Sequence, residues 1–155
     1  TAETYRKAVK MFKDKFPQFT ISTDIIVGFP TETEEDFEKT IDLLLETKPD
    51  IVNLSKYSQR PGTEAAEWDQ VEVTDVMRRS KIISDLIEKI CLENNRKWIG
   101  WKGKVLFDEI SDDEIKGRNF AYKPIFIKEP VRIGEYHDVE IINATTHSLL
   151  GKIAS

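Results

Sequence analysis

The chain has 155 residues, of which 39% are hydrophobic and 33% are charged, so its composition is that of an ordinary folded protein and not of a disordered one. No apolar run approaches the roughly 20 residues of a membrane-spanning helix, and the single cysteine, Cys91, excludes both an intrachain disulfide and a cysteine-held metal or iron–sulfur site. The net charge of −5 argues against a protein that binds nucleic acid over its whole surface. Because the N-terminus also lacks the basic-then-apolar layout of a signal peptide, the sequence predicts a cytoplasmic protein.

The charge along the chain narrows where a nucleic acid could bind. Residues 1–99 hold 15 basic and 19 acidic side chains, a net charge of −4, and residues 100–155 hold 8 basic and 9 acidic ones, a net charge of −1. Because neither part is strongly basic, any contact with RNA must be confined to a small patch.

The first part of the chain alternates between helical and extended patterns. Apolar residues at helical spacing, Tyr5, Val9 and Phe12, predict a helix over 3–14. The β-branched run over 19–27 is short and nearly unbroken, which is typical of a strand that is buried on both faces in a parallel sheet.

A second helix and a second strand follow. The helix is expected over about 33–47, with Thr31 or Thr33 as its N-cap and Glu34 or Asp36 at the third helical position. Its inward-facing residues are expected to be Phe37, Ile41, Leu44 and Leu45. A strand begins at Ile51, and strands that alternate with helices build right-handed β/α units around a parallel sheet, which two strands cannot complete.

A long helix closes this part of the chain. After a loop over 59–72, Thr74 is the expected cap of a helix that reaches about Lys97 and includes Cys91 as a packing residue. The apolar stripe of this helix is Val76, Ile83, Leu86, Ile87 and Ile90, and its charged residues on other faces are Arg78, Arg79, Lys81, Glu88 and Lys89.

From Gly100 onward the pattern changes to short extended runs that are separated by turns, and no helical period remains. We therefore expect an α/β domain over 1–99 and a separate all-β domain over 100–155, a small five-stranded antiparallel barrel. The acidic run 112–114 is the expected tip of a hairpin, and 98–103 is the expected hinge between the domains.

Two motifs leave the carboxyl ends of the predicted strands, which is where parallel sheets bind ligands. The first, TDIIVGFPTETEEDF over 23–37, ends a strand in a turn at Gly28, whose missing side chain lets a cofactor approach the backbone. Alternatively, Gly28 and Pro30 only shape the loop. The second, YSQRPGT over 57–63, carries Arg60, which could pair with a carboxylate or phosphate or could be a surface residue in a turn.

Together the two motifs, TDIIVGFP-x-E-T and then KYS-x-RPGT, resemble the methylthiotransferase branch of the radical-SAM enzymes, and THSLLGK near the end resembles the closing strand of their TRAM domain. This resemblance implies that 1–99 is the C-terminal part of a radical-SAM β/α barrel, a partial TIM-like barrel. It implies that 100–155 is a TRAM domain, an OB-like barrel that binds RNA. Thr31 stands where many relatives have Gly, which fits if its φ is negative.

In that family the first motif lies near the adenine of S-adenosylmethionine and the second lies beside the reacting centre. The resemblance therefore implies that the cofactor-binding residues are Ile26, Val27, Gly28, Phe29, Pro30, Tyr57 and Ser58. It also implies that Asp24 and Arg60 belong to the substrate pocket, and it assigns no catalytic residue.

The resemblance also implies parts that lie outside this chain. The family holds two 4Fe-4S clusters, one on a CxxxCxxC motif and one in an N-terminal domain, and Cys91 supplies neither. We therefore expect a C-terminal fragment that is inactive alone, with the cluster and barrel regions of the same protein as its partners.

Basic and aromatic residues alternate in the barrel region, an arrangement in which cations can meet phosphates and rings can stack on bases. The alternative is that the aromatic residues fill the barrel core and the charges form its wet face. With the TRAM resemblance, the expected partner is the anticodon stem-loop of tRNA, and the expected RNA-binding residues are Lys102, Lys104, Arg118, Asn119, Tyr122, Lys123 and His147.

Other polar and aromatic residues have simpler expected roles. The acidic cluster over 32–38 is expected to be the solvated first turns of a helix, and His137 and His147 are too isolated to indicate a metal site. Packing at the domain junction is expected of Trp68, Trp98 and Trp101.

For the intact protein, the resemblance implies a methylthio transfer to C2 of N6-threonylcarbamoyladenosine next to the tRNA anticodon, closest to the archaeal type of enzyme. Isopentenyladenosine and an aspartate of a ribosomal protein are the alternative substrates. A non-catalytic RNA-binding adaptor is the alternative from another class, and it predicts that 1–99 is a closed fold without exposed strand edges.

Overall fold

The structure is a computed structural model that describes residues 1–111 and 114–154. Residues 112 and 113, which belong to the predicted hairpin tip, lie outside the described residues. Among the helices that the structure describes, none is both long and apolar enough to cross a membrane.

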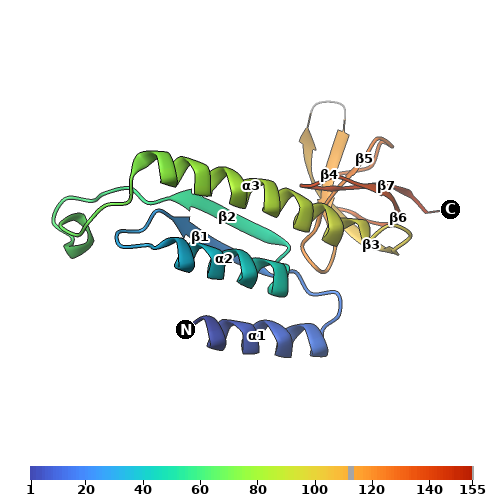
Figure 1. Ribbon diagram of the computed structural model, residues 1–155. Coiled ribbons are helices and arrows are strands. Elements are labelled where there is room, and N and C mark those ends of the chain that lie inside the picture. Colours follow the sequence, from blue (N-terminus) through green and yellow to red (C-terminus); the bar gives the residue numbers. More distant parts are fainter. Residues whose placement is uncertain (112–113, 155) are drawn as a thin grey trace. The chain divides into compact units, whose positions relative to one another are not determined.

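The chain forms two compact units (Figure 1). The first consists of Thr1–Lys15 and Ile21–Ile90, and the second consists of Phe16–Thr20 and the chain from Cys91 onward. The elements before the barrel are α1 (Ala2–Lys15), β1 (Ser22–Val27), α2 (Glu34–Thr47), β2 (Ile51–Lys56), the short 3-10 helix η1 (Glu64–Ala66) and α3 (Val73–Arg96). This alternation of helices and parallel strands confirms the predicted α/β class.

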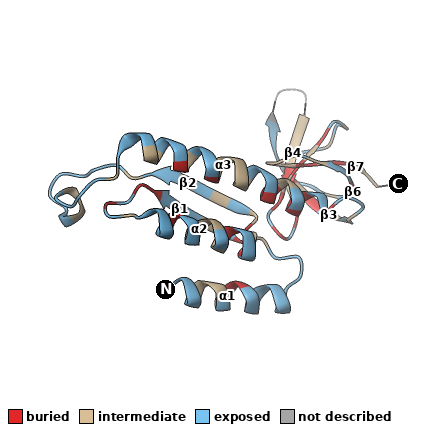
Figure 2. Cartoon of the chain, in the orientation of Figure 1, coloured by how far each residue is buried: buried red, intermediate tan, exposed pale blue. Residues whose placement is uncertain are grey.

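In the first unit, β1 and β2 are parallel neighbours, with Ser22 opposite Ile51 and Val27 opposite Lys56. Successive side chains point to opposite faces of the sheet. Val27 is fully buried, whereas its neighbour Ile26 is 54% exposed. Much of β1 and β2 has the colours of exposed and intermediate residues (Figure 2). The prediction that β1 is buried on both faces is therefore wrong for this chain, because the core of the first unit covers only one face of the described sheet.

That core lies between the sheet and the inward faces of α2 and α3. Its buried members are Val27, Phe37, Leu44, Ile83 and Ile90. Leu45 was expected among them but is 48% exposed. Adjacent helical residues are about 100° apart, so Leu45 points well away from the direction in which Leu44 enters the core.

The beginnings of the two long helices refine the predicted caps. In α2, Asp36 N donates to Thr33 Oγ1 at 3.1 Å and Thr33 N donates to Asp36 Oδ2 at 3.2 Å, which is a complete capping box. Thr33 and Asp36 thus resolve the alternatives left by the sequence. Helix α3 begins at Val73, so Thr74, the expected cap, already lies in its first turn.

The second unit is built around a closed five-stranded barrel with the order β3-β4-β5-β7-β6. Its strands are β3 (Lys102–Ser111), β4 (Glu114–Arg118), β5 (Pro124–Ile127), β6 (Tyr136–Ala144) and β7 (Leu149–Ile153). The barrel confirms the predicted five strands, but β5 and β7 run parallel, with Ile125 opposite Leu149. An odd number of strands in a closed ring cannot alternate in direction throughout, so one pair at least must be parallel, and the fully antiparallel prediction is wrong.

Side chains fill the barrel interior, as in other small barrels. The fully or nearly fully buried members of its core include Val105, Phe107, Ile125, Ile127, Val139, Ile141 and Leu149. Phe120 and Tyr122, in contrast, are 69% and 67% exposed. The alternative in which the aromatic residues of this region all fill the core therefore does not hold for these two rings.

Candidate cofactor pocket and nucleic-acid interface

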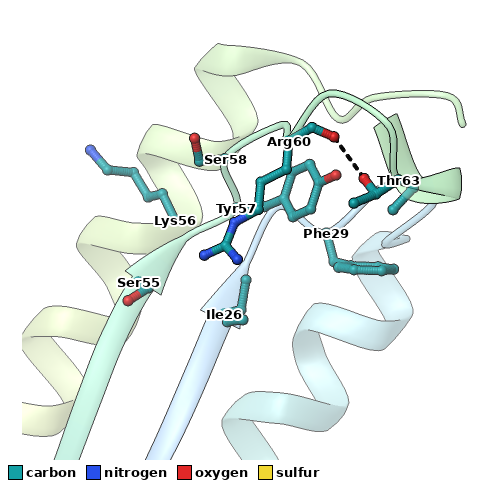
Figure 3. A pocket seen from close by; sticks show the side chains of 9 residues that line it. Ile26, Phe29, Ser55, Lys56, Tyr57, Ser58, Arg60 and Thr63 are labelled. Carbon is teal, nitrogen blue, oxygen red and sulfur yellow. Dashed lines mark hydrogen bonds between the residues drawn. The ribbon is translucent and has the colours of Figure 1, made fainter. Parts of the chain in front are cut away.

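A pocket of about 540 Å³ lies at the carboxyl ends of β1 and β2 (Figure 3). It is lined by Ile26, Phe29, Ser55, Lys56, Tyr57, Ser58, Arg60, Thr63 and Ala65. Strand ends are the usual ligand-binding edge of a parallel sheet, and both sequence motifs reach this edge. Of the seven predicted cofactor-binding residues, the four that line the pocket are Ile26, Phe29, Tyr57 and Ser58.

An aromatic wall stands at one side of this pocket. The ring centroid of Phe29 lies 5.3 Å from that of Tyr57 and 6.0 Å from that of Trp68, and both pairs are close to perpendicular. Edge-to-face packing of this kind is favourable and keeps the rings in fixed orientations. Trp68 is therefore a neighbour of the pocket wall, a role that its position in a long loop did not reveal.

Arg60 is held at the pocket by its backbone. Thr63 Oγ1 and Thr63 N donate to the Arg60 carbonyl at 2.8 and 3.3 Å, and Gly62 closes the turn with a φ of +82°. The guanidinium points back toward the strand ends, near Ile26 (Figure 3). Among the described residues it has no hydrogen-bond or ion-pair partner, so it is free to meet an anionic group of a ligand.

Asp24 lies on the exposed face of the sheet, two residues before Ile26. It is opposite Asn53 in the strand register, and Asn53 Nδ2 donates to Asp24 Oδ1 at 2.8 Å. The pocket lining does not include Asp24. The structure thus places the Asp24 carboxylate and the Asn53 amide as a polar pair on the same sheet face that carries the pocket residues Ile26 and Ser55.

The remaining predicted cofactor residues, Val27, Gly28 and Pro30, are buried. Gly28 has a φ of +73°, and a Cβ on it would lie 2.5 Å from a methyl group of Val76 in α3. Glycine is therefore needed at position 28 so that the turn can pack against α3, which is a different explanation from the close approach of a cofactor. Thr31 has a φ of +69°, so the expected negative φ is wrong.

A buried ion pair fastens this turn to α3. Arg79 Nη1 donates to Glu32 Oε2 at 2.8 Å and to the Glu32 carbonyl at 3.0 Å, and Glu32 Oε2 also accepts from Gly28 N at 2.8 Å. The side chains of Arg79 and Glu32 are only 5% and 11% exposed. The expectation that Glu32 lies on a solvated face is therefore wrong, and Arg79, which was expected on a face other than the apolar stripe, is buried as well.

Arg79 could have been found from the sequence, because it stands between Val76 and Ile83 at the spacing of the apolar stripe of α3. A buried arginine needs an acidic partner, and two are supplied here, by Glu32 in the turn before α2 and by Glu34, the first residue of α2. Glu34 also accepts from Arg78 and Arg79, at 2.7 and 3.0 Å, and its hydrogen bond with Arg78 lowers the pKa of its carboxyl.

In the barrel, the predicted RNA-binding residues divide into exposed and buried ones. Lys102 and Lys104 are exposed, but they lie 3.6 Å from Glu140 and 3.5 Å from Asp138. The backbone N of His147, in the turn before β7, donates to Thr145 Oγ1 at 3.2 Å.

The last residue of β4, Arg118, and the loop that follows it hold the other four predicted residues. Asn119 and Lys123 are 5% and 3% exposed, and each makes hydrogen bonds inside the second unit. Arg118 and Tyr122 lie at the surface, with the guanidinium carbon 4.3 Å from the centroid of the Tyr122 ring. Of these four predicted residues, Arg118 and Tyr122 are the two whose side chains can reach a ligand without rearrangement.

The three tryptophans have definite environments. Trp98 belongs to the barrel core and packs against Trp101, with ring centroids 5.6 Å apart, and Trp68 contacts Phe29 in the first unit. Among the described residues, there is no group of three or more His, Cys, Asp or Glu residues placed to hold a metal ion.

A parallel β/α segment with a pocket at its strand ends, followed by a small closed barrel, defines the class of this chain as an α/β segment joined to a small β-barrel. The chain is homologous over its whole length to a part of the archaeal threonylcarbamoyladenosine tRNA methylthiotransferases. No family model matches the chain.

The similarity extends to archaeal and bacterial proteins. The chain is 41% identical over 154 residues to a probable threonylcarbamoyladenosine tRNA methylthiotransferase of Pyrococcus horikoshii. The matched region covers 99% of the chain and 36% of the relative. A protein of the same name from Archaeoglobus fulgidus is also 41% identical, over 100% of the chain and 36% of the relative. A tRNA-2-methylthio-N(6)-dimethylallyladenosine synthase of Aquifex aeolicus is 36% identical, over 99% of the chain and 35% of the relative. The chain thus spans about a third of the length of these relatives.

Proposed function

We propose that this chain is the pocket-and-barrel part of a cytoplasmic radical-SAM tRNA methylthiotransferase that modifies C2 of N6-threonylcarbamoyladenosine next to the anticodon. The observation that carries the proposal is the identity of 41% to archaeal threonylcarbamoyladenosine tRNA methylthiotransferases over essentially the whole chain. In this proposal residues 1–99 supply walls of the cofactor and substrate pocket, and residues 100–155 bind the tRNA.

The pocket residues fit S-adenosylmethionine. A volume of about 540 Å³ lies within the range of small-molecule sites, and the lining combines apolar and aromatic side chains with the cations Lys56 and Arg60. Ile26, Phe29 and Tyr57 would hold the apolar parts of the cofactor, and Ser58 would hold a polar part. When bound, S-adenosylmethionine supplies the methyl group and, after cleavage at an iron–sulfur cluster, the radical that the reaction needs.

The residues of the chain do not fit a 4Fe-4S cluster. Such clusters are held by several cysteine thiolates, and the chain has only Cys91, which is buried in α3. We therefore assign both clusters to parts of the relatives that the chain does not match.

For the substrate, we propose that Arg60 and Asp24 orient the modified adenosine. Threonylcarbamoyladenosine carries a carboxylate, and an arginine without a protein partner is suited to bind one through its planar guanidinium. The dimethylallyl group of the alternative nucleoside has no charge for Arg60 to bind.

A non-catalytic adaptor is less well supported by the sheet. That reading predicts a closed fold without exposed strand edges, whereas the described sheet has two strands and exposes Ile26 and Ile51 by 54% and 39%. An apolar sheet face of this kind is suited to packing against further strands.

An exchange of segments tests the proposed function. The matching segment of the Pyrococcus horikoshii relative is replaced by this chain, and the nucleosides of tRNA treated with the reconstituted chimera are analysed by mass spectrometry. We expect 2-methylthio-N6-threonylcarbamoyladenosine, and less of it from a chimera with Arg60→Met. The matched chimera in the Aquifex aeolicus relative should give little of the dimethylallyl product. A folded, cluster-loaded archaeal chimera without product would contradict the proposal.

A further inference from the structure

We propose that the loop over 118–123 is a platform on which an unpaired RNA base stacks against the ring of Tyr122, so that the barrel selects single-stranded over duplex RNA. This inference rests on the proposed RNA binding of the barrel, and it adds the element that does the binding and the form of RNA that it accepts.

Buried and exposed residues alternate strictly along this loop. Asn119, Ala121 and Lys123 are 5%, 9% and 3% exposed, whereas Phe120 and Tyr122 between them are 69% and 67% exposed. Three consecutive odd-numbered residues therefore fix the loop to the barrel unit, and the two even-numbered residues present aromatic rings to the solvent.

Each of the three buried residues is held by hydrogen bonds. Asn119 Oδ1 accepts from the backbone N of Ala121 and from that of Lys123, both at 3.1 Å. The Ala121 carbonyl accepts from Thr20 Oγ1 at 2.7 Å, and Lys123 Nζ donates to Asn95 Oδ1 at 3.0 Å. The contacts of Asn119 and Lys123 restrict the conformation of the loop. The exposed rings of Phe120 and Tyr122 are therefore held in fixed positions.

Tyr122 has a φ of +62°, in the left-handed region that glycine tolerates best. A bulky residue in this conformation is strained, and strain of this kind gathers where a ligand is bound. Because the ring is largely exposed, burial in the barrel core does not offset the strain. Binding of a ligand to the ring would explain why a tyrosine stands at this position.

Arg118 completes the platform. Its guanidinium carbon lies 4.3 Å from the centroid of the Tyr122 ring, and its Nη1 donates to the Tyr122 carbonyl at 3.4 Å. The guanidinium therefore covers one face of the ring and leaves the other for a base. Phe120 stands two residues earlier, supported by Trp98 and Trp101 at centroid distances of 6.0 and 6.2 Å.

The charges of the barrel favour a single strand over a duplex. Affinity for duplex RNA comes largely from cations that meet a row of phosphates, and the barrel region has a net charge of −1, with Lys102 and Lys104 close to acidic side chains. A ring, in contrast, needs a base that is free of its stack, which loops provide and helices do not. Stacking is also sequence-tolerant, which suits binding beside a target that the pocket itself selects.

The test uses the whole 155-residue chain and two fluorescently labelled RNAs, a hairpin with an unpaired loop of anticodon length and a blunt duplex with the same stem. We expect tighter binding of the hairpin. Tyr122→Gly, which removes the ring and relaxes the left-handed backbone, should weaken hairpin binding by about 10-fold, as loss of one base–aromatic stack does. The melting temperature of the Tyr122→Gly variant should equal or exceed that of the unmodified chain, so the loss of RNA affinity cannot come from unfolding.

Two matched variants complete the test. Tyr122→Phe keeps the ring and should keep the affinity for the hairpin. Tyr136→Ala removes another barrel tyrosine of similar exposure, 64%, and should change neither affinity nor preference.

The outcomes separate this inference from the proposed function. Equal binding of hairpin and duplex, or hairpin binding that Tyr122→Gly leaves unchanged, would overturn the platform while RNA binding by the barrel stands. No binding of either RNA would overturn both.

Discussion

The sheet of the first unit and the barrel of the second treat their strands in opposite ways. Among the described residues, β1 and β2 pair only with each other, so one edge of each strand and one face of the sheet are open, whereas every barrel strand has two neighbours. Open edges and exposed apolar faces promote association with other strands. The difference teaches that the barrel is complete as a hydrogen-bonded unit, while the sheet is suited to be extended.

One phenylalanine in each unit should give the largest difference between the two units when it is replaced by alanine. Phe107 is fully buried in the barrel core, and Phe29 is 42% exposed at the pocket. We expect Phe107→Ala to lower the free energy of unfolding by about 3–5 kcal/mol through the cavity it leaves. Phe29→Ala should cost about 1 kcal/mol or less and should instead weaken S-adenosylmethionine binding in the reconstituted chimera. Urea unfolding measures the first effect and a cofactor titration the second; equal losses of stability would contradict the assignment.

Within the first unit, two neighbouring arginines differ in what surrounds them. Arg79→Met should destabilise the chain by about 3 kcal/mol, because it leaves the buried Glu32 carboxylate without its partner. Arg78→Met is the matched control, since Arg78 also pairs with Glu34 but is exposed, and its loss of stability should be much smaller. Urea unfolding of both variants measures the two losses of stability. Similar midpoints would show that the Arg79–Glu32 pair stabilises the pocket turn no more than the exposed Arg78 pair does.

Two glycines that flank the pocket sharpen the role of α3. Both have positive φ, but a Cβ would meet Val76 at Gly28 and nothing within 4 Å at Gly62. Gly62→Ala should cost only the backbone strain, about 1 kcal/mol, and Gly28→Ala should cost about 2–4 kcal/mol because packing strain is added. If adding Val76→Ala restores the free energy of unfolding that Gly28→Ala removes, the close approach to Val76 is confirmed. If the free energy is not restored, the strain lies in the backbone alone.

Thr31 offers a smaller effect of the opposite sign. A β-branched residue with a φ of +69° is strained, and its amide already donates to the Asp69 carbonyl, a bond that glycine would keep. Thr31→Gly should therefore raise stability by about 1 kcal/mol. Thr33→Gly, which removes the N-cap side chain of α2, should lower it. A thermal melt of both variants shows whether the signs differ as expected.

The smallest effect is a dependence on pH. The hydrogen bond with Arg78, chiefly, holds the pKa of Glu34 below its ordinary value of 4.5, and a lowered carboxyl pKa means stability that is present above that value and is lost as the pH falls through the native pKa. Stability measured in urea should therefore fall on acidification below 4.5, and less steeply in Arg78→Met. An unchanged slope would show that solvent screens the pair completely.

Local patterns predicted most of the elements and the position of the pocket. The helical period of α1, the capping box of Thr33 and Asp36, and the change of pattern at Gly100 all depend on residues that are close in sequence. The family resemblance implied that Phe29 and Tyr57 contact a cofactor, and both residues line the pocket, because the carboxyl ends of neighbouring parallel strands meet at one edge.

What the sequence by itself determined are the elements, their order and the two loops that carry the candidate sites, since backbone propensity and turn chemistry act over a few residues. Only the tertiary structure decided which faces are covered. It buried Asn119 and Lys123, which had been predicted to bind RNA, and it gave Gly28 a neighbour, Val76, from a distant helix. Burial is a property of what other segments bring to a residue, and no local pattern contains that information.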